Sequence, residues 1–240
     1  MTQVCIAGFA ALDRRPRPER LCRSALDGIG LFGGRPLERH VGRASFGALS
    51  FSAQSPLAAI GERYLCVADE SIENVADLRR ALGSSPKGSG AALLLAAWLR
   101  WGEALTDHLV GEYAFAIYDH EDQSLVLARD PSGYRPLFYA RLPGVLGFAS
   151  MPSGLTSSVV DQQPDLPHVA AYLGGSAGGA FSTFWKGVNR VPPGSVLRIS
   201  ANRITRRDIL SPPEAELAAE DWPGLVEKLF YSRGGGGITV

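Results

Sequence analysis

Three cysteines, Cys5, Cys22 and Cys66, are the side chains of this 240-residue sequence that could serve as thiol nucleophiles or redox groups. Their number is odd, their spacing is wide, and no C-x-x-C pair indicates a metal or redox site. Cys5 lies in the apolar run QVCIAGFAAL, where a free cysteine is most often a small buried residue. Cysteine usage of this kind is typical of a reducing compartment, so we predict a cytoplasmic protein.

Other residue types common in active sites form no recognisable motif. The four histidines lack the mutual spacing of metal ligands, so no metal is expected. The glycine-rich segment 174–180, GGSAGGA, lacks the Lys-Ser/Thr pair of a phosphate loop and predicts a connector. Arg129 and Asp130 are adjacent, and turn hydrogen bonds or a local ion pair that hold a strand end explain them better than a site does.

Composition excludes several classes of protein. The sequence has 24 Lys+Arg, 24 Asp+Glu and no net charge, which argues against a dedicated nucleic-acid binder or a polybasic membrane module. Hydrophobic residues make up 45% of the chain, enough for a substantial core. We find no signal-peptide pattern at the start and no apolar stretch long enough to span a bilayer. Neither nucleic acid nor membrane is therefore expected as a partner.

The elements that position these residues are predicted to be short strands and a few helices. Strands are expected over 3–12, 44–52 and 62–68, and an antiparallel meander over 113–148. A further hairpin is expected near the end, with Pro192, Pro193 and Gly194 in its entry turn. The basic, Pro-containing stretch 14–20 predicts no regular structure.

Helices are predicted where the apolar spacing changes. Residues 71–82 predict an amphipathic helix capped by Ser71 and ended by Gly83. Residues 91–101 are apolar on nearly every side and predict a mostly buried helix that Gly102 ends. Shorter helices are expected over 166–173 and, in two pieces, over 211–231. Helices beside antiparallel strands imply sheets with one face against helices and the other against a second sheet.

The block from Trp98 to Tyr139 carries a motif with fixed spacing. It contains W-G at 101–102, G-x-x-A-F-x-x-x-D at 111–119, and L-x-L-A-R-D-x-x-G-x-x-P-L-x-Y at 125–139. This block resembles the N-terminal glutamine amidotransferase domain of the asparagine synthetase family, and similar segments occur at 5–9, 69–82, 147–155 and 188–199. The resemblance implies an α+β fold, a four-layer αββα Ntn-hydrolase sandwich of two antiparallel sheets between helices.

The extent of the resemblance gives the expected domain organisation. Residues 1–208 are expected to form the glutamine amidotransferase-like domain, and residues 209–240 a linker helix and the first strand of a truncated ATP-dependent synthetase domain. In the family, a strand like the final RGGGGITV runs into an S-G-G-x-D-S loop whose amides and hydroxyls hold the pyrophosphate of ATP.

The resemblance also identifies the position of the nucleophile. In active relatives a cysteine becomes N-terminal when Met is removed, and its own α-amino group serves as the base. Alignment on Ile6–Phe9 puts Val4 at that position and Cys5 where the family has glycine, with three residues before Val4. No catalytic residue is therefore expected, and Cys5 would act only after removal of residues 1–4. A one-residue shift along a strand also turns a side chain to the opposite face.

The glutamine-binding residues implied by the resemblance are altered as well. The family's Asn-Gly-Glu stretch aligns with Asp69, Glu70 and Ser71, and an acid that pairs with the substrate ammonium falls near Ser89. Arg43 is the one local candidate for the arginine that binds the glutamine carboxylate. An unpaired carboxylate at Asp69 would repel an anionic substrate group. We therefore predict a vestigial pocket made of Arg43, Asp69, Glu70 and Ser89.

These losses predict an inactive glutaminase with a structural role, as in the β-lactam synthetases and lasso-peptide cyclases of the same family. The expected partner is an ATP-dependent, amide-forming synthetase domain in cis or in trans, and a precursor peptide is a further candidate. No cofactor is expected in this chain, since ATP and Mg would belong to the synthetase domain. Two alternatives stay open: an active glutaminase that supplies ammonia for asparagine synthesis after processing to Cys5, and a stand-alone module that binds a peptide or partner.

Overall fold

The computed structural model of the chain describes residues 4–13, 16–30, 33–83, 88–157, 163–176, 179 and 181–209. Within these residues, two six-stranded antiparallel sheets form the centre of the fold. Sheet A consists of β1 (Val4–Ala11), β2 (Arg35–Val41), β3 (Ala44–Ser50), β8 (Phe138–Leu142), β9 (Val145–Ala149) and β10 (Val188–Arg190). Sheet B consists of β4 (Leu57–Ile60), β5 (Tyr64–Ile72), β6 (Gly111–Asp119), β7 (Ser124–Arg129), β11 (Ser195–Ile199) and β12 (Ile204–Asp208).

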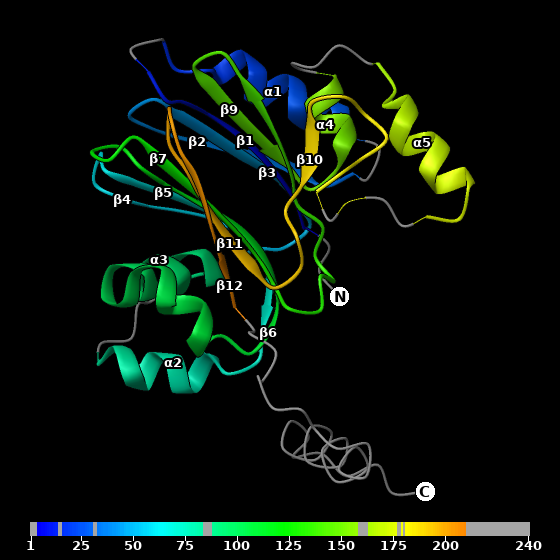
Figure 1. Ribbon diagram of the computed structural model, residues 1–240. Coiled ribbons are helices and arrows are strands. Elements are labelled where there is room, and N and C mark those ends of the chain that lie inside the picture. The colour runs from blue at the N-terminus through cyan, green and yellow to red at the C-terminus, as the bar shows by residue number, and fades with distance from the viewer. Residues whose placement is uncertain are drawn as a thin grey trace, which may run out of the picture. The chain divides into compact units, whose positions relative to one another are not determined.

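The two sheets stack face to face, and helices cover their outer faces (Figure 1). The strand order is β10-β8-β9-β1-β3-β2 in sheet A and β12-β11-β7-β6-β5-β4 in sheet B. On sheet A pack α1 (Glu19–Gly28) and α4 (Pro152–Thr156). On sheet B packs α3 (Gly90–Trp101), which continues into the 3-10 helix η2 (Gly102–His108) and contacts α2 (Val75–Leu82). The predicted four-layer αββα sandwich is confirmed.

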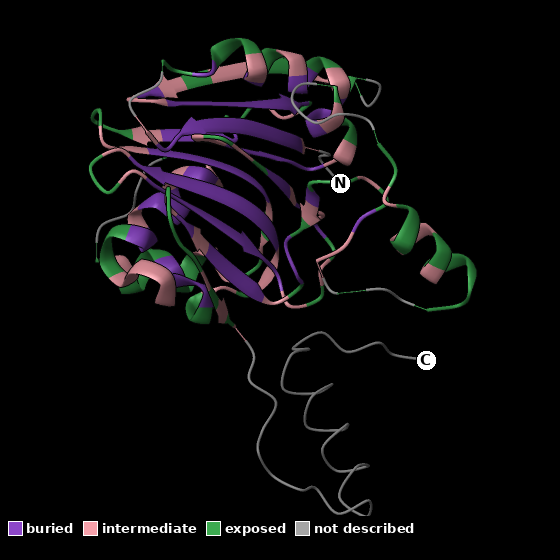
Figure 2. Ribbon diagram, turned by 45° about the horizontal axis from the view of Figure 1, so that its top comes forward, coloured by how far each residue is buried: buried purple, intermediate pink, exposed green. Residues whose placement is uncertain are grey.

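Strand β1 is buried on both faces, as Figure 2 shows for the central strands generally. Ile6 joins Phe46 and Phe148 in the core between the sheets, where the two phenylalanine rings meet edge to face at 4.8 Å. Phe9, on the other face of β1, packs in the core under α1. Because both faces are covered, the strand is a continuous apolar run and does not alternate with polar residues.

Two of the predicted helices are confirmed and one is wrong at its start. The helices expected over 91–101 and 166–173 are α3 and α5 (Leu166–Leu173), the latter beside the sandwich. The helix expected over 71–82 begins only at Val75, because Ser71 and Ile72 continue β5 and pair with β6. Gly83 ends the helix in the left-handed conformation, as expected.

The meander predicted over 113–148 is divided between the two sheets. Strands β6 and β7 form a hairpin in sheet B, whereas β8 and β9 form a hairpin in sheet A. Residues 130–137 carry the chain from one sheet to the other. The second predicted hairpin is confirmed as β11 and β12.

Several elements were not expected from the sequence. Helix α1 begins at Glu19, inside the stretch 14–20 that predicted no regular structure, and strands β2 and β4 were not predicted. The linker helix and strand expected over 209–240 lie, apart from residue 209, outside the described residues. Part of the glycine-rich segment 174–180 also lies outside them.

Candidate functional site

A small cavity of about 160 Å³ lies where the start of β1 meets the end of β5 and the start of α3. The structure brings three of the residues singled out from the sequence, Val4, Glu70 and Ser89, to this cavity. Its described lining is Val4, Ser52, Gln54, Ser55, Pro56, Ala68, Glu70, Ser89 and Gly90. Glu70 is the one charged residue in that lining, so no described cation is in place to bind the carboxylate of an amino acid.

The first two residues of β1 point to opposite faces of sheet A. Val4 packs against the core between the sheets and reaches the cavity, whereas Cys5 packs in the core under α1. Burial, and secondarily the Asp69 carboxylate, raises the pKa of the Cys5 thiol. A nucleophilic cysteine needs a lowered pKa, because the thiolate is the reactive form. Cys5 is therefore a protonated, buried thiol in this fold.

The backbone that follows is fixed from the neighbouring strand. Buried Ser150, just past β9, accepts a hydrogen bond from the Ile6 amide at 2.9 Å through its hydroxyl. Its own amide donates to the Ile6 carbonyl at 2.8 Å. These two bonds hold β1 in register near the cavity, so its side chains cannot exchange faces without losing them.

Glu70 is engaged by its own chain. Its carboxylate accepts a hydrogen bond from the Ile72 amide at 3.2 Å and lies against Gly90, the first residue of α3. A Cβ at Gly90 would overlap this carboxylate, which explains the need for glycine there. Negative charge at a helix N-terminus is favourable. The carboxylate thus stabilises the α3 terminus as well as lining the cavity.

Asp69 does not line the cavity but lies buried beside it in an ion pair. Its carboxylate contacts Arg135 at 3.0 Å, and Arg135 also contacts Glu112 at 3.4 Å. Burial raises the pKa of Asp69 to about 6, although Arg135 acts in the opposite direction. The expectation of an unpaired carboxylate at Asp69 is therefore wrong. One arginine compensates two carboxylates, and the buried Nε of Arg135 has no hydrogen-bond partner within the described chain.

Sequence reasoning missed Arg135, and the structure shows what presents it. Arg129 donates to the carbonyls of Arg135 (2.8 Å), Val191 (3.1 Å) and Gly133. Asp130 accepts from the Arg135 amide at 3.2 Å. The interpretation of Arg129 and Asp130 as residues that hold a strand end by turn hydrogen bonds is confirmed. The turn they stabilise directs Arg135 toward Asp69.

The structure does not bring Arg43 to the cavity. Arg43 lies in the turn between β2 and β3, where its guanidinium donates to the Asp13 carbonyl at 2.5 Å and its own carbonyl accepts from the Ala11 amide. Val4 and Ala11 are the two ends of β1, about 23 Å apart at the rise of an extended strand. Arg43 therefore belongs to the opposite end of sheet A.

The described lining of the cavity contains no cysteine and no histidine. No group of three or more His, Cys, Asp or Glu among them is arranged to hold a metal ion. Nor does any described helix combine the length and the apolar character that crossing a bilayer requires. The chemistry left at this end of the fold is a small, hydroxyl-lined cavity with one carboxylate, next to a buried ion-pair cluster.

Comparison with known proteins gives a consistent picture. A family model described as a glutamine amidotransferase domain matches residues 34–209. Asparagine synthetase [glutamine-hydrolyzing] 1 of Bacillus subtilis (strain 168) is 31% identical over 150 residues, 60% of this chain and 23% of the relative. A putative asparagine synthetase [glutamine-hydrolyzing] of Mycobacterium bovis is 31% identical over 153 residues, with the same shares. The chain thus spans less than a quarter of the length of these curated relatives.

A solved structure shares the architecture. Glutamine phosphoribosylpyrophosphate amidotransferase from B. subtilis superimposes with a TM-score of 0.60 at 14% sequence identity, over 87% of this chain and 50% of the other. At that identity the similarity shows the fold alone. It matches the two antiparallel sheets and their outer helices described above.

Proposed function

Because the chain belongs to the glutamine amidotransferase domain family and is related to the N-terminal domains of asparagine synthetases, we propose that it is a hydrolytically inactive member with a structural role. Its partner in this proposal is an ATP-dependent synthetase domain, in cis or in trans, that forms an amide bond. The observation that carries the proposal is the start of β1, where Val4 faces the cavity and Cys5 faces α1.

Hydrolysis by an N-terminal nucleophile needs a thiol and its base on the residue that faces the substrate. Val4 has a hydrocarbon side chain and provides neither. Cys5 faces the helix layer, and burial raises the pKa of its thiol, so the reactive thiolate is disfavoured. The start of β1 therefore provides neither the thiol nor its base on the side that faces the cavity.

The residues that align with the family's glutamine-binding stretch already have partners, which supports the same conclusion. Glu70 is engaged by the Ile72 amide, and Asp69 is engaged by Arg135. The described cavity lining contains no cation that could hold the α-carboxylate of glutamine. A free amino acid would therefore have to displace existing contacts to bind, at a cost in affinity.

In this proposal ATP and Mg²⁺ bind the synthetase domain, and this chain holds no cofactor of its own. The working protein would resemble the β-lactam synthetases and lasso-peptide cyclases in keeping the domain without ammonia production, and a precursor peptide is the candidate acceptor. The three cysteines are free and buried, which supports a cytoplasmic location.

A glutaminase assay on the full 240-residue chain tests the inactive state. We expect no glutamate release above the rate without protein, for the unaltered chain and for Cys5→Ala alike. Cys66→Ala is the matched control, since it removes a buried thiol of β5 that packs in the core under α3. Glutamate release that is lost in Cys5→Ala and kept in Cys66→Ala would overturn the proposal. Intact-mass spectrometry would then have to show a chain that begins at Cys5.

Co-expression tests the structural role. The chain is produced together with the ATP-dependent synthetase polypeptide that its own genome encodes, whether in the same reading frame or a neighbouring one. We expect a stable complex or a single longer protein that consumes ATP to join a carboxylate to an amine as an amide, without hydrolysing glutamine. A chain that stays monomeric and binds no synthetase would contradict this role and favour the stand-alone module.

A further inference from the structure

Helix α5 is apolar but buries none of its residues within the described chain. Its sequence from Leu166 to Leu173 is LPHVAAYL. The exposed fractions are 64% for Leu166, 61% for Tyr172 and 80% for Leu173. Figure 2 shows the helix in the colours of exposed and intermediate residues, beside the buried sandwich. Large apolar side chains gathered on one exposed element mark interaction sites.

The apolar side chains of α5 lie along one face, with Leu166, Tyr172 and Leu173 exposed and Val169 half-buried. Leu166, Val169, Tyr172 and Leu173 follow a helical spacing that places them in one stripe. Exposed Phe184 extends the stripe, since its ring meets that of Tyr172 edge to face at 5.1 Å. We call these five residues the α5 patch.

Hydrogen bonds and ring contacts, and not a buried core, hold α5 in place. Asp165 caps the helix by accepting from the His168 amide at 3.2 Å, and the Asp165 amide donates to the Phe184 carbonyl at 2.8 Å. An isolated bridge joins Pro164 to Trp185. A helix of 8 residues is marginal by itself in water, and helices in proteins are stabilised chiefly by packing an apolar face. The face that would provide this stability is the α5 patch.

The chemistry of the patch favours an apolar protein surface as its partner. Between Leu166 and Leu173 the helix has no Lys, Arg, Asp or Glu. It therefore lacks the positive charge that attracts phosphates of nucleic acids or anionic lipids. Five side chains are also too few for a stable interface between free proteins, which uses roughly 20–30 residues a side. The partner must be attached to the chain or be held by further contacts.

We propose that a synthetase portion covers the α5 patch with an apolar face of its own. This inference rests on the proposed function. The curated relatives meet the requirement for an attached partner, because more than three quarters of their length lies beyond the stretch that matches this chain. A second copy of the chain does not meet it, since two such patches alone would bury too little area to form a stable dimer.

Hydrogen exchange measured on the 240-residue chain, alone and with the synthetase polypeptide encoded by its genome, tests the location. We expect the amides of 166–173 to exchange at least about tenfold more slowly in the complex, because their opening would be coupled to dissociation. Association with unchanged exchange at 166–173 would overturn the inference and leave the proposed function intact. No association at all would instead contradict the proposed function itself.

Paired substitutions test the side chains. Leu166→Ser with Leu173→Ser should weaken association by at least about tenfold, and should leave the thermal midpoint of the isolated chain unchanged since both residues are exposed. Ile60→Ser with Leu99→Ser is the matched control, because these exposed apolar residues lie on sheet B and α3. Equal weakening by both pairs would overturn the inference. So would concentration-dependent dimerisation of the chain alone that the first pair abolishes.

Discussion

Two aspartates lie at opposite ends of the β5–β6 pair, and their pKa values are shifted in opposite directions. Asp69 is opposite Ala114 near the cavity, whereas Asp119 is opposite Tyr64 near the β6–β7 turn. Burial raises the pKa of Asp69 to about 6 despite the contact with Arg135. Burial also acts on Asp119, but hydrogen bonds from Arg63 and from two backbone amides outweigh it and lower the pKa of its carboxyl.

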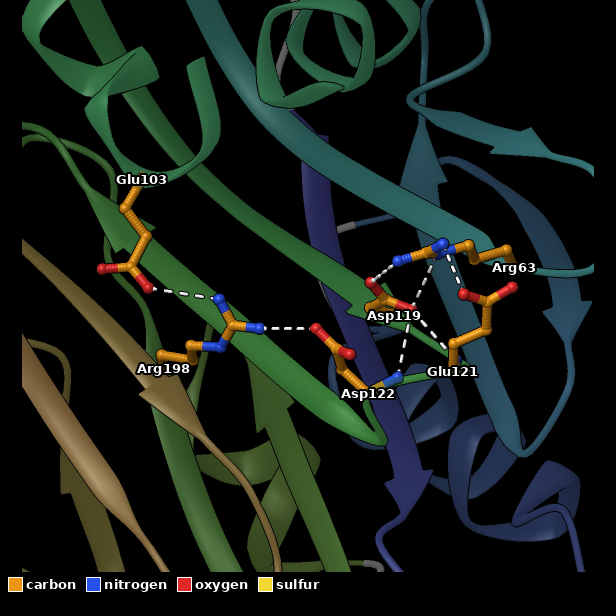
Figure 3. Close-up of polar contacts among 6 residues, drawn as sticks. All are labelled: Arg63, Glu103, Asp119, Glu121, Asp122 and Arg198. Atoms are coloured by element: carbon orange, nitrogen blue, oxygen red, sulfur yellow. Dashed lines mark hydrogen bonds and ion pairs between the residues drawn. The ribbon is translucent and has the colours of Figure 1, made fainter. Parts of the chain in front are cut away.

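The difference lies in how many donors each carboxylate has and how near they are to water. At the turn, Arg63 contacts both oxygens of Asp119, at 3.2 and 3.1 Å, and also pairs with Glu121 (Figure 3). Arg198 similarly joins Glu103 and Asp122. At the cavity, one buried arginine is shared between Asp69 and Glu112.

The comparison teaches that, of these two described carboxyls, the one near the cavity is held in an unfavourable environment and the one at the turn is not. Strongly perturbed carboxyls in a fold that is otherwise well satisfied are typical of functional sites. The cavity end keeps that character although Val4, which lines the cavity there, has a hydrocarbon side chain. The turn end has the arrangement expected of residues selected for stability.

The largest difference in stability between the two ends should appear when Arg135 or Arg63 is removed. Arg135→Met leaves the carboxylates of Asp69 and Glu112 without this cation, the first of them buried, and should lower the free energy of unfolding by about 3–5 kcal/mol. Arg63→Met removes an arginine whose side chain is 40% exposed, and two backbone amides still donate to the Asp119 carboxylate, so the loss of stability should be smaller. Urea unfolding of both variants measures the difference. A greater loss for Arg63→Met would break the comparison.

The pH dependence should show the next largest contrast. The pKa of Asp69 is about 6 in the folded chain, against an ordinary 3.8, so the folded state binds an extra proton between these values. The free energy of unfolding should therefore fall as the pH rises through this window, by about 3 kcal/mol for a shift of about two units. Asp69→Asn should remove this fall, as measured by urea unfolding across the window.

Asp119→Asn supplies the opposite case. Because the folded pKa of Asp119 is lowered, its contribution to stability is present above the unfolded pKa and is lost as the pH falls through the folded one. The variant should reduce only the loss of stability in acid, below about pH 4. If Asp69→Asn and Asp119→Asn changed the free energy of unfolding in the same pH range, the two aspartates would not differ as described.

The turns at the two ends should give the smallest contrast. Gln123 in the β6–β7 turn has a φ of 49°, so Gln123→Gly should relieve strain and stabilise the chain by up to about 1 kcal/mol. Gly133 near Arg135 has a φ of 65°, and an added Cβ would lie 2.7 Å from the Pro193 side chain. Gly133→Ala should therefore destabilise. Thermal unfolding measures whether each substitution stabilises or destabilises the chain. If both shifted the thermal midpoint in the same direction, the two turns would not differ.

Local patterns predicted the strands and helices that have strong periodicity and clear turns. Helix α3 and the β11–β12 hairpin are examples. Helix α1 was missed because Pro16 and Pro18 are typical of irregular structure. Proline is nevertheless tolerated just before a helix and in its first turn, and α1 begins directly after Pro18. The spacing of Cys22, Ala25 and Leu26, which α1 buries, carried the missing signal.

Long-range arrangement was beyond a single sequence. The pattern over 113–148 showed hairpins but not which sheet each would join, because that depends on pairing with β1 and β11. The resemblance located Asp69, yet its partner Arg135 is 66 residues away and occupies a position that the family motif leaves open. A search for a cation to compensate Asp69 could have found it, since buried carboxylates are almost always paired.

The strand order also determines how the protein resists aggregation. In the described part of the chain, the edge strands are β10 and β2 in sheet A and β12 and β4 in sheet B. Strands β10 and β4 have only three and four residues. Strand β2 carries Pro36 and Arg39, and β12 carries Arg206 and Arg207. Short, proline-containing or charged edges disfavour pairing with strands of another molecule, so none of the four described edge strands is a long apolar edge on which copies of the chain could stack.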